Sequence, residues 1–524
     1  MLFPFFLLYN MKKLSLLLCF LGAVVLSFAQ NVTITPRGIT PAMTGSYPRI
    51  SYDAILALPN PAKGDMAFDM TFNCLRVYTG SKWICTYQSP TDPPNITALA
   101  SAGGTSYDEG NGIAVDGLGN VYVTGSYEGT ATFGTTAKTS AGGSDIFVAK
   151  YNSSGALQWV QSAGGTSDDS GNDIAVDRSG NVYVTGYYIG TATFGTTTKT
   201  SAGSNDLFVA KYNSSGALQW VQSAGGTLSD AGNAITADGS GNVYVTGYYQ
   251  ETATFGTTTK TSAGSTDIFV AKYNSSGALQ WVQSAGGTFS DQGNGIAVDG
   301  SGNVYVTGKY EATATFGTTS KTSAGGYDIF VAKYNSVGVI WDWVQSAGGT
   351  TDDVGKGIAV DGSGNVYVTG WYFGTATFGT TTNGTTTKTS AGLFDIFVAK
   401  YNSNGASYWV QSAGGIFNDV GYGIAVDVSG NVYVTGEYAG TATFGTTTKT
   451  SAGSIDIFVA KYNSSGLQWV QSAGGTFSDQ GNGIAVDGSG NVYVTGKYEA
   501  TATFGNNSLS SAGRWDMVLM RIDK

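Results

Sequence analysis

The sequence of 524 residues contains no histidine. A chain without imidazole cannot build a Ser-His-Asp or Cys-His nucleophile, and it offers no imidazole ligand to a metal ion. Charged residues are also scarce, at 12% of the chain, and the net charge is −10. Because an acidic chain without a basic run repels phosphate backbones and anionic lipids, we expect no nucleic-acid partner.

Cysteine and arginine are almost as rare. Of the three cysteines, Cys19 lies in an apolar N-terminal run, so only Cys74 and Cys85 could pair, as one local disulfide in an oxidising compartment. This count excludes a scaffold built on disulfides. Six arginines are present, and three of them lie beyond residue 94, which excludes a site made of several converging guanidinium groups there.

Long apolar runs are absent after the N-terminal segment, so no membrane insertion is expected. Met11, Lys12 and Lys13 begin a basic segment, residues 14–26 are apolar, and residues 27–29 have the small-x-small pattern of a cleavage site. We therefore predict that residues 1–29 are a signal peptide cleaved near Ala29. The mature protein is expected to be secreted or exposed at the cell surface, with the periplasm as an alternative.

One motif, NVYVTG, occurs seven times. Its copies are separated by 60 to 66 residues and begin at Asn120, Asn181, Asn242, Asn303, Asn365, Asn431 and Asn491. A fixed period of this length is typical of a solenoid or a propeller.

Each repeat contains four short segments that are rich in β-branched and aromatic residues, in the order GIAVD, NVYVTG, DIFVAKY and LQWVQSA. The sequences DGSGN and NSSG lie between them and supply residues that tolerate the positive φ of tight turns. The pattern predicts a four-stranded antiparallel meander in every repeat.

The two ends of the repeat region differ from the other copies. The last repeat stops after its third segment at 516–524, whereas ITALASAGG at 96–104 aligns with the fourth segment, LQWVQSAGG. A linear β-solenoid, the main alternative, would need caps for its open edges. We therefore predict an all-β fold in which residues 95–524 form a monomeric seven-bladed β-propeller of four-stranded antiparallel blades, closed by an N-terminal strand.

Residues 30–94 have a different composition, with most of the prolines and both remaining cysteines. The segment 64–86 alternates as a β-hairpin does, and QSPTDPPN at 88–95 is typical of a stiff linker. This region is predicted to be a small N-terminal β-hairpin module followed by a proline-rich linker.

The repeat resembles the bacterial SBBP family, which is named after its seven-bladed β-propeller. The resemblance rests on GNGIAVDGSGNVYVTG, TATFG, DIFVAKYN and LQWVQSAGG, which recur in this order from about Asn95 to Lys524. It implies an exported or surface-associated protein, and it assigns no activity and no catalytic residues.

Three aspartates recur in every repeat, and the first repeat has them at Asp108, Asp116 and Asp145. Aspartate commonly accepts backbone N–H groups in turns, so a structural role is favoured and no cofactor is expected. Calcium ligation is the alternative, because carboxylates are hard oxygen donors. However, the loop is shorter than a twelve-residue calcium loop and lacks its closing glutamate.

Functional positions should depart from the repeat. The residue after VYVTG differs between copies and reads Ser126, Tyr187, Tyr248, Lys309, Trp371, Glu437 and Lys497. Tyr107 and Asp168 vary in the same way just before the first aspartate. Both sets are expected on the face that bears the connections between strands 2 and 3 and between strands 4 and 1, where a protein or glycan ligand would bind. Neutral drift on a solvated rim is the alternative.

The leading hypothesis is a non-enzymatic binding or display scaffold. A glycoside hydrolase or lyase that uses carboxylates alone is the alternative from another class, because two carboxyl groups suffice for that chemistry. No pair of carboxylates stands out among seven equivalents, so no catalytic residue is assigned.

Overall fold

The computed structural model describes residues 94–523 apart from 336–339 and 382–383, together with 32–35, 38–41, 49–50, 54–55, 57–58, 61–69, 74–80 and 83–88. The chain divides into two compact units, Met1–Pro93 and Pro94–Lys524. None of the helices in the described residues has the length and hydrophobicity of a membrane span.

The first unit contains two small sheets. One pairs β1 (Val32–Thr35) with β2 (Gly38–Pro41), and the other joins β3 (Arg49–Ile50), β4 (Met66–Asp69), β5 (Cys74–Tyr78) and β6 (Trp83–Gln88). The register pairs Cys74 with Gln88 and Cys85 with Arg76, so the two cysteines lie on neighbouring strands but not opposite each other. Their side chains lie outside the described ones, and the disulfide stays a prediction.

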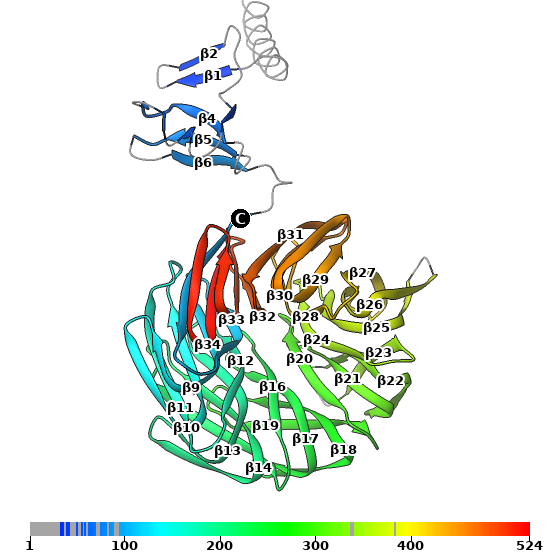
Figure 1. The fold of residues 1–524 in the computed structure, drawn as a ribbon. Coiled ribbons are helices and arrows are strands. Elements are labelled where there is room, and N and C mark those ends of the chain that lie inside the picture. The colour runs from blue at the N-terminus through cyan, green and yellow to red at the C-terminus, as the bar shows by residue number, and fades with distance from the viewer. Residues whose placement is uncertain are drawn as a thin grey trace, which may run out of the picture. The chain divides into compact units, whose positions relative to one another are not determined.

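The second unit is a closed ring of repeated antiparallel strands (Figure 1). We call each repeat a blade; blade 1 holds β8 (Asp108–Val115), β9 (Val121–Phe133), β10 (Thr136–Tyr151) and β11 (Leu157–Gly165). Blades 2 to 4 follow as β12 (Ser170–Val176), β13 (Val182–Phe194), β14 (Thr197–Tyr212), β15 (Leu218–Gly226), β16 (Ala231–Ala237), β17 (Val243–Phe255), β18 (Thr258–Tyr273), β19 (Leu279–Gly287), β20 (Gln292–Val298), β21 (Val304–Phe316), β22 (Thr319–Tyr334) and β23 (Trp341–Gly349).

Blades 5 to 7 consist of β24 (Asp353–Val360), β25 (Val366–Thr381), β26 (Gly384–Tyr401), β27 (Ser407–Gly415), β28 (Val420–Val426), β29 (Val432–Phe444), β30 (Thr447–Asn463), β31 (Gly466–Gly475), β32 (Gln480–Val486), β33 (Val492–Phe504), β34 (Asn507–Ile522) and, from the start of the unit, β7 (Ile96–Gly103). The predicted all-β ring of seven repeats is confirmed.

The first strand of each blade has a different kind of connection at each of its two ends. A loop leads into it from the fourth strand of the preceding blade, as at residues 104–107, and a DGSGN-type turn leaves it, as at 116–120. These connections lie at opposite ends of the strand and therefore on opposite faces of the ring. We call the face with the entering loops (104–107, 166–169, 227–230, 288–291, 350–352, 416–419 and 476–479) the loop face, and the face with the turns (116–120, 177–181, 238–242, 299–303, 361–365, 427–431 and 487–491) the turn face.

The turn face is built by the second aspartate of each repeat. Asp116 Oδ1 accepts the backbone N–H groups of Leu118 and Asn120, both at 2.9 Å, while Gly119 adopts a φ of +77°. Partial burial opposes ionisation of Asp116, but the hydrogen bonds from Asn120, Leu118 and Tyr122 outweigh it and lower its pKa. The same backbone turn recurs in all blades.

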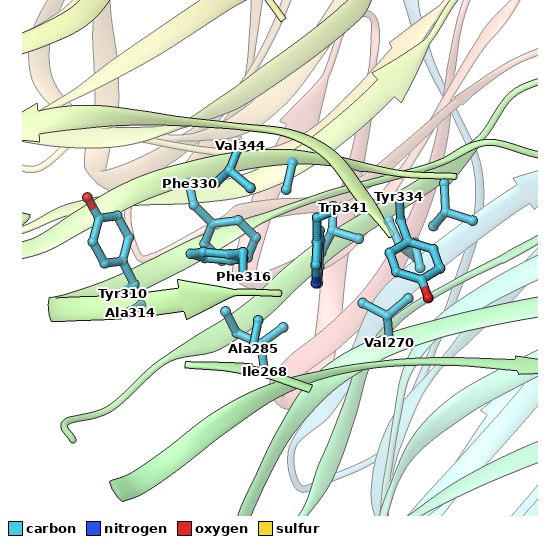
Figure 2. Close-up of a cluster of buried hydrophobic side chains, with 14 of the residues drawn as sticks. Ile268, Val270, Ala285, Tyr310, Ala314, Phe316, Phe330, Tyr334, Trp341 and Val344 are labelled. Atoms are coloured by element: carbon cyan, nitrogen blue, oxygen red, sulfur yellow. The ribbon is translucent and has the colours of Figure 1, made fainter. Parts of the chain in front are cut away.

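Apolar side chains fill the space between neighbouring blades. Figure 2 shows one such cluster, in which Ile268 and Val270 of blade 3 face Phe316, Phe330 and Trp341 of blade 4. The ring planes of Phe316 and Trp341 meet at 87° with centroids 5.5 Å apart, an edge-to-face contact. The recurring phenylalanine of TATFG is therefore a core residue, and it is buried in every blade.

Backbone pairing also crosses from blade to blade. The last residues of β11 pair with β13 of the next blade, with Gly164 opposite Thr193 and Gly165 opposite Ala192. A Cβ atom at Gly165 would lie 2.1 Å from the carbonyl oxygen of Thr191, so only glycine permits this approach. The conserved spacing of the SAGG segment thus reflects a hydrogen-bonded junction between blades.

The first aspartate of the repeat fastens this junction. Asp169 Oδ2 accepts the N–H of Gly165 at 2.7 Å, and its Oδ1 accepts the N–H of Ile189 in β13 at 2.9 Å. The third aspartate lies nearby: Asp145 Oδ2 accepts the N–H of Ala141 at 3.1 Å, while its Oδ1 is buried without a hydrogen-bond partner. Both aspartates therefore have structural roles in the geometry, and each blade repeats them.

Burial has a clear electrostatic consequence for these two aspartates. It raises the pKa of Asp169 and of Asp145 from 3.8 to about 6, and the corresponding aspartates of the other blades reach about 6 or 7. Each carboxyl group therefore binds its proton more tightly in the folded state than in the unfolded chain.

This predicts a fold that gains stability on mild acidification. As the pH falls from about 7 to about 4, protonation of the buried aspartates should raise the melting temperature, because it favours the folded state. Below about pH 4 those turn aspartates whose pKa is lowered, such as Asp116, become protonated and the gain should reverse. Thermal unfolding followed by circular dichroism at constant ionic strength checks this; a melting temperature that is flat or falls from pH 8 to pH 5 would contradict it. The variant Asp267→Asn removes one of these buried groups, the third aspartate of blade 3. It should make the melting temperature rise less steeply as the pH falls.

The same geometry predicts that calcium is not required for folding. Among the described residues, no three carboxylate or cysteine side chains converge on a position that could hold a metal ion. Adding EDTA should therefore leave the melting temperature of the mature protein unchanged. A fall of ~10 °C or more would indicate a saturated metal site that contributes several kcal/mol to the free energy of unfolding. A purely structural role of the aspartates would then be wrong.

The ends of the second unit meet in blade 7. β7 pairs antiparallel with β34, with Ile96 opposite Ile522 and Ala102 opposite Met517, and the red and blue strands lie side by side in Figure 1. Ile96 packs into the apolar cluster between blades 6 and 7, and Ser101 shares a hydrogen bond of 2.8 Å with Tyr498.

Loss of β7 should therefore open the ring. Deleting residues 31–104 should lower the free energy of unfolding by several kcal/mol, since each buried apolar side chain contributes about 1.5–3 kcal/mol, and should promote aggregation through the exposed edge of β34. Deleting only residues 31–90 is the matched control and should leave the ring intact. Equal melting temperatures and solubility for the two truncations would contradict closure by β7.

Candidate functional site

The first strands of the blades surround the axis of the ring and carry a circle of amide side chains. The Nδ2 atoms of Asn111, Asn172, Asn233, Asn294 and Asn482 each donate to a glycine carbonyl of the next blade, at 2.9–3.1 Å. These hydrogen bonds tie neighbouring first strands together around the axis.

The circle changes at blades 5 and 6. Lys356 and Tyr422 occupy the positions where the other blades have asparagine. Blade 2 departs in another way, because Asp173 stands where the other blades have glycine or alanine, and its carboxylate accepts the N–H groups of Ile174 and Ile235, both at 2.8 Å. The axis is therefore chemically asymmetric although the backbone around it repeats.

A cavity of about 510 Å³ opens on the axis at the loop face, and we call it the axial cavity. Its wall consists of Glu109, Asn111, Ser170, Asn172, Tyr187, Asn233, Tyr248, Gln292, Asn294, Lys356, Tyr422 and Asn482. A narrower space of about 190 Å³ is lined by the following residues of the first strands, including Ile113 and Asp173. All blades contribute to the cavity, so it exists only in the closed ring.

Two of the predicted site residues, Tyr187 and Tyr248, line the axial cavity. They follow VYVTG in the adjacent blades 2 and 3, opposite Ser170 and Ala231 in the sheet. Burial raises the pKa of Tyr187, and the charges of Asp168 and Glu109 add to this effect. The Tyr187 phenol therefore stays protonated and can donate a hydrogen bond at neutral pH.

Three other predicted residues pack against aromatic rings on the third strand of the same blade. The Lys309 Nζ atom lies 3.8 Å from the ring centroid of Tyr327, and the Lys497 Nζ atom lies 3.7 Å from that of Trp515. Trp371 stacks on Phe394, with centroids 4.1 Å apart. None of the three lines the axial cavity, so the structure places them around it rather than within it.

Glu437 and Lys497 connect the cavity wall to neighbouring blades. Glu437 accepts hydrogen bonds from the Tyr422 hydroxyl at 3.1 Å and from Gln480 Nε2 of blade 7 at 2.8 Å, and burial raises its pKa. The Lys497 ammonium forms a salt bridge of 2.9 Å with Glu109 of blade 1. Glu109 and Glu437 are thus both already engaged by protein groups.

The remaining predicted residues lie apart from the cavity. Ser126 is buried in the sheet opposite Glu109, and Asp168 accepts the backbone N–H of Ser144 at 3.0 Å. Tyr107 is 38% exposed, contacts the Trp515 ring and accepts a hydrogen bond from Arg514. These side chains shape the loops and are not gathered with the two tyrosines.

Sequence comparison among the copies overlooked the first strand. Five copies have asparagine as the second residue of this segment, whereas blade 5 reads GKGIAVD and blade 6 reads GYGIAVD; among the five, blade 2 alone has aspartate next, in GNDIAVD. The departures at Lys356, Tyr422 and Asp173 are visible in the sequence, but the comparison between copies covered only the residue after VYVTG and the residues before the first aspartate.

Exposed apolar side chains distinguish the loop face as well. Phe289, Phe417 and Phe477 occupy the same position in the entering loops of blades 4, 6 and 7, and each is 49% exposed. The end of the blades that bears the turns also has exposed apolar side chains among its described residues, at Leu118, Val428, Ile340 and Tyr408, but each occupies a different position of the repeat. Residue variation, aromatic rings and the axial cavity therefore coincide on one face.

Among curated proteins, the chain is similar to an uncharacterized WD repeat-containing protein of Acanthamoeba polyphaga mimivirus, with 25% identity over 80% of this chain and 37% of that protein. It is also similar to the regulatory protein FlaEY of Caulobacter vibrioides, with 28% identity over 44% of this chain and 26% of FlaEY. The chain thus spans little more than a third of the mimivirus protein and about a quarter of FlaEY.

Among solved structures, the WD40 β-propeller domain of Doa1 matches with a TM-score of 0.43 and 11% identity, over 82% of this chain and 98% of that domain. The quinohemoprotein alcohol dehydrogenase of Comamonas testosteroni matches with a TM-score of 0.39 and 9% identity, over 82% of this chain and 76% of the enzyme.

A family model described as a beta-propeller repeat, SBBP, matches the chain in every blade. The matched residues are 102–126, 158–187, 219–248, 280–309, 342–371, 409–437 and 468–497. They run from the fourth strand of one blade to the residue after VYVTG in the next, which are the segments that build the junctions between blades and the wall of the axis. This chain belongs to the SBBP beta-propeller repeat family.

Proposed function

We propose that this protein is an exported, non-enzymatic binding scaffold that captures a protein partner on its loop face. The scaffold is a seven-bladed propeller with four-stranded blades, latched by β7. One observation carries the proposal: the residues that break the repeat gather on the loop face around the axial cavity, whereas the turn face repeats the same turn in every blade.

The division between constant and variable residues supports a binding role. Constant residues, such as Asp169 and Gly165, hold the junctions between blades and are needed in every copy. The residue after VYVTG has no such shared structural role, because its side chain varies from Ser126 to Trp371 although the backbone is the same in every blade. Variation on a rigid frame is how loop-bearing scaffolds acquire specific partners.

A protein partner is favoured by the apolar groups on the rim. Phe289, Phe417 and Phe477 project partly exposed rings from three blades, and large aromatic side chains contribute most to protein interfaces. The WD-repeat description of the mimivirus relative is consistent with this class of partner. Export is proposed on the basis of residues 1–29, whose pattern is that of a signal peptide.

A carboxylate-based hydrolase is less well supported. Such an enzyme needs one carboxyl group to donate a proton and a second to act as base or nucleophile. Glu109 of the cavity wall is paired with Lys497, and Glu437, which contacts the wall residue Tyr422, accepts two hydrogen bonds from protein side chains. We therefore propose recognition without catalysis.

The test is a selection of peptides from a random displayed library on the mature protein, followed by affinity measurements on variants. The triple variant Phe289→Ser, Phe417→Ser, Phe477→Ser should weaken the selected peptides by at least tenfold, since an interface anchor typically contributes about 2 kcal/mol or more.

The matched control is Leu118→Ser with Val428→Ser, which removes exposed apolar groups from the turn face, where they are 87% and 97% exposed. This control should bind as the parent does. Peptides that depend on the control positions, or that ignore the three phenylalanines, would contradict the proposal.

A further inference from the structure

We propose that the axial cavity is a separate site for an acidic sugar, a uronic acid residue of a saccharide, whose carboxylate is bound by Lys356. This inference goes beyond capture of a protein on the rim, because it concerns a cavity on the axis and a different class of ligand. It rests on the charge, the hydrogen-bonding groups and the asymmetry of the cavity wall.

The charge of the wall favours an anion. Only two of its residues are charged, Glu109 and Lys356, and Glu109 is paired with Lys497 at 2.9 Å. The Lys356 ammonium makes no hydrogen bond or salt bridge to the described residues, and its side chain is half-buried. A partly desolvated ammonium without an acceptor gains from a bound carboxylate, which supplies both charge and hydrogen bonds.

The rest of the wall favours a ligand rich in hydroxyl groups. Its other ten residues are five asparagines, three tyrosines, one glutamine and one serine, and no aliphatic side chain is among them. The short acidic side chain of a peptide would engage Lys356 but leave most of these amides and hydroxyls without a partner. A sugar ring presents donors and acceptors in several directions and can pair with many of them.

The placement of the aromatic residues agrees with this ligand. Tyr187 and Tyr248 belong to the adjacent blades 2 and 3, whereas Lys356 and Tyr422 belong to blades 5 and 6, across the axis. A ligand that fills about 510 Å³ can therefore touch an aromatic wall on one side and the ammonium on the other. One or two sugar residues match a cavity of this size.

The asymmetry of the wall shows that Lys356 is not a scaffold residue. Asparagine at this position donates to a glycine carbonyl of the next blade in five blades, as Asn294 does to Gly355 at 2.9 Å. Lys356 gives up that hydrogen bond to blade 6, so its presence weakens the circle around the axis. A residue that costs the scaffold a bond while adding an unpaired charge to a cavity is best explained by a ligand.

The experiment measures binding of sodium glucuronate and sodium galacturonate to the mature protein by isothermal titration calorimetry and saturation-transfer NMR. Glucose and galactose serve as neutral probes, and N-acetylglutamate serves as an acidic probe without hydroxyl groups. At least one uronate should bind, at least tenfold more tightly than its neutral counterpart and than N-acetylglutamate.

The variant Lys356→Asn restores the residue of the other blades and should fold at least as stably as the parent. It should lose uronate affinity by at least tenfold, whereas Lys309→Asn, a lysine outside the cavity wall, should not. Absence of uronate binding, equal binding by Lys356→Asn, or equal affinity for N-acetylglutamate would overturn the proposal. The triple phenylalanine variant should bind uronate unchanged, so that failure of the rim site and failure of the cavity site are distinguishable.

Discussion

The whole ring depends on one buried contact that recurs in every repeat. In it, the first aspartate accepts hydrogen bonds from the backbones of two neighbouring blades. Asp169 ties the end of β11 to β13, and because Gly165 has no Cβ atom the two strands approach closely enough to pair. The contact occurs in every blade, and it carries a carboxylate into an environment that raises its pKa. A ring built on such contacts is rigid at its junctions, and its stability is coupled to protonation.

Rigidity at the junctions allows variation elsewhere. The backbone around the axis repeats, yet the side chains that it presents there include amides, phenols, one ammonium and one carboxylate. The turn face has a fixed backbone, because Asp116 and its counterparts hold the same turn in each blade. Binding on the loop face and stability at the junctions are therefore properties of separate residues, and one can change without the other.

Much of the fold was predictable from the sequence because repetition amplifies weak signals. Seven copies of the same strand and turn pattern indicated an all-β ring, and the internal comparison singled out Tyr187 and Tyr248, which line the axial cavity. Lys309, Trp371 and Lys497 were instead found packed on aromatic rings, since the alternation along a strand does not reveal what a neighbouring strand contributes. Lys356 and Tyr422 could not be recognised as wall residues without knowing that first strands line the axis.

The central claim is that ligands meet this protein on the loop face and on the axis, never on the turn face. Hydrogen–deuterium exchange of the mature protein, with and without a saturating selected peptide, tests it most directly. The account predicts slower exchange in the entering loops, such as 288–291 and 416–419, and in the first residues of the first strands, with the turns at 116–120 and 427–431 unchanged. Protection confined to those turns would contradict it.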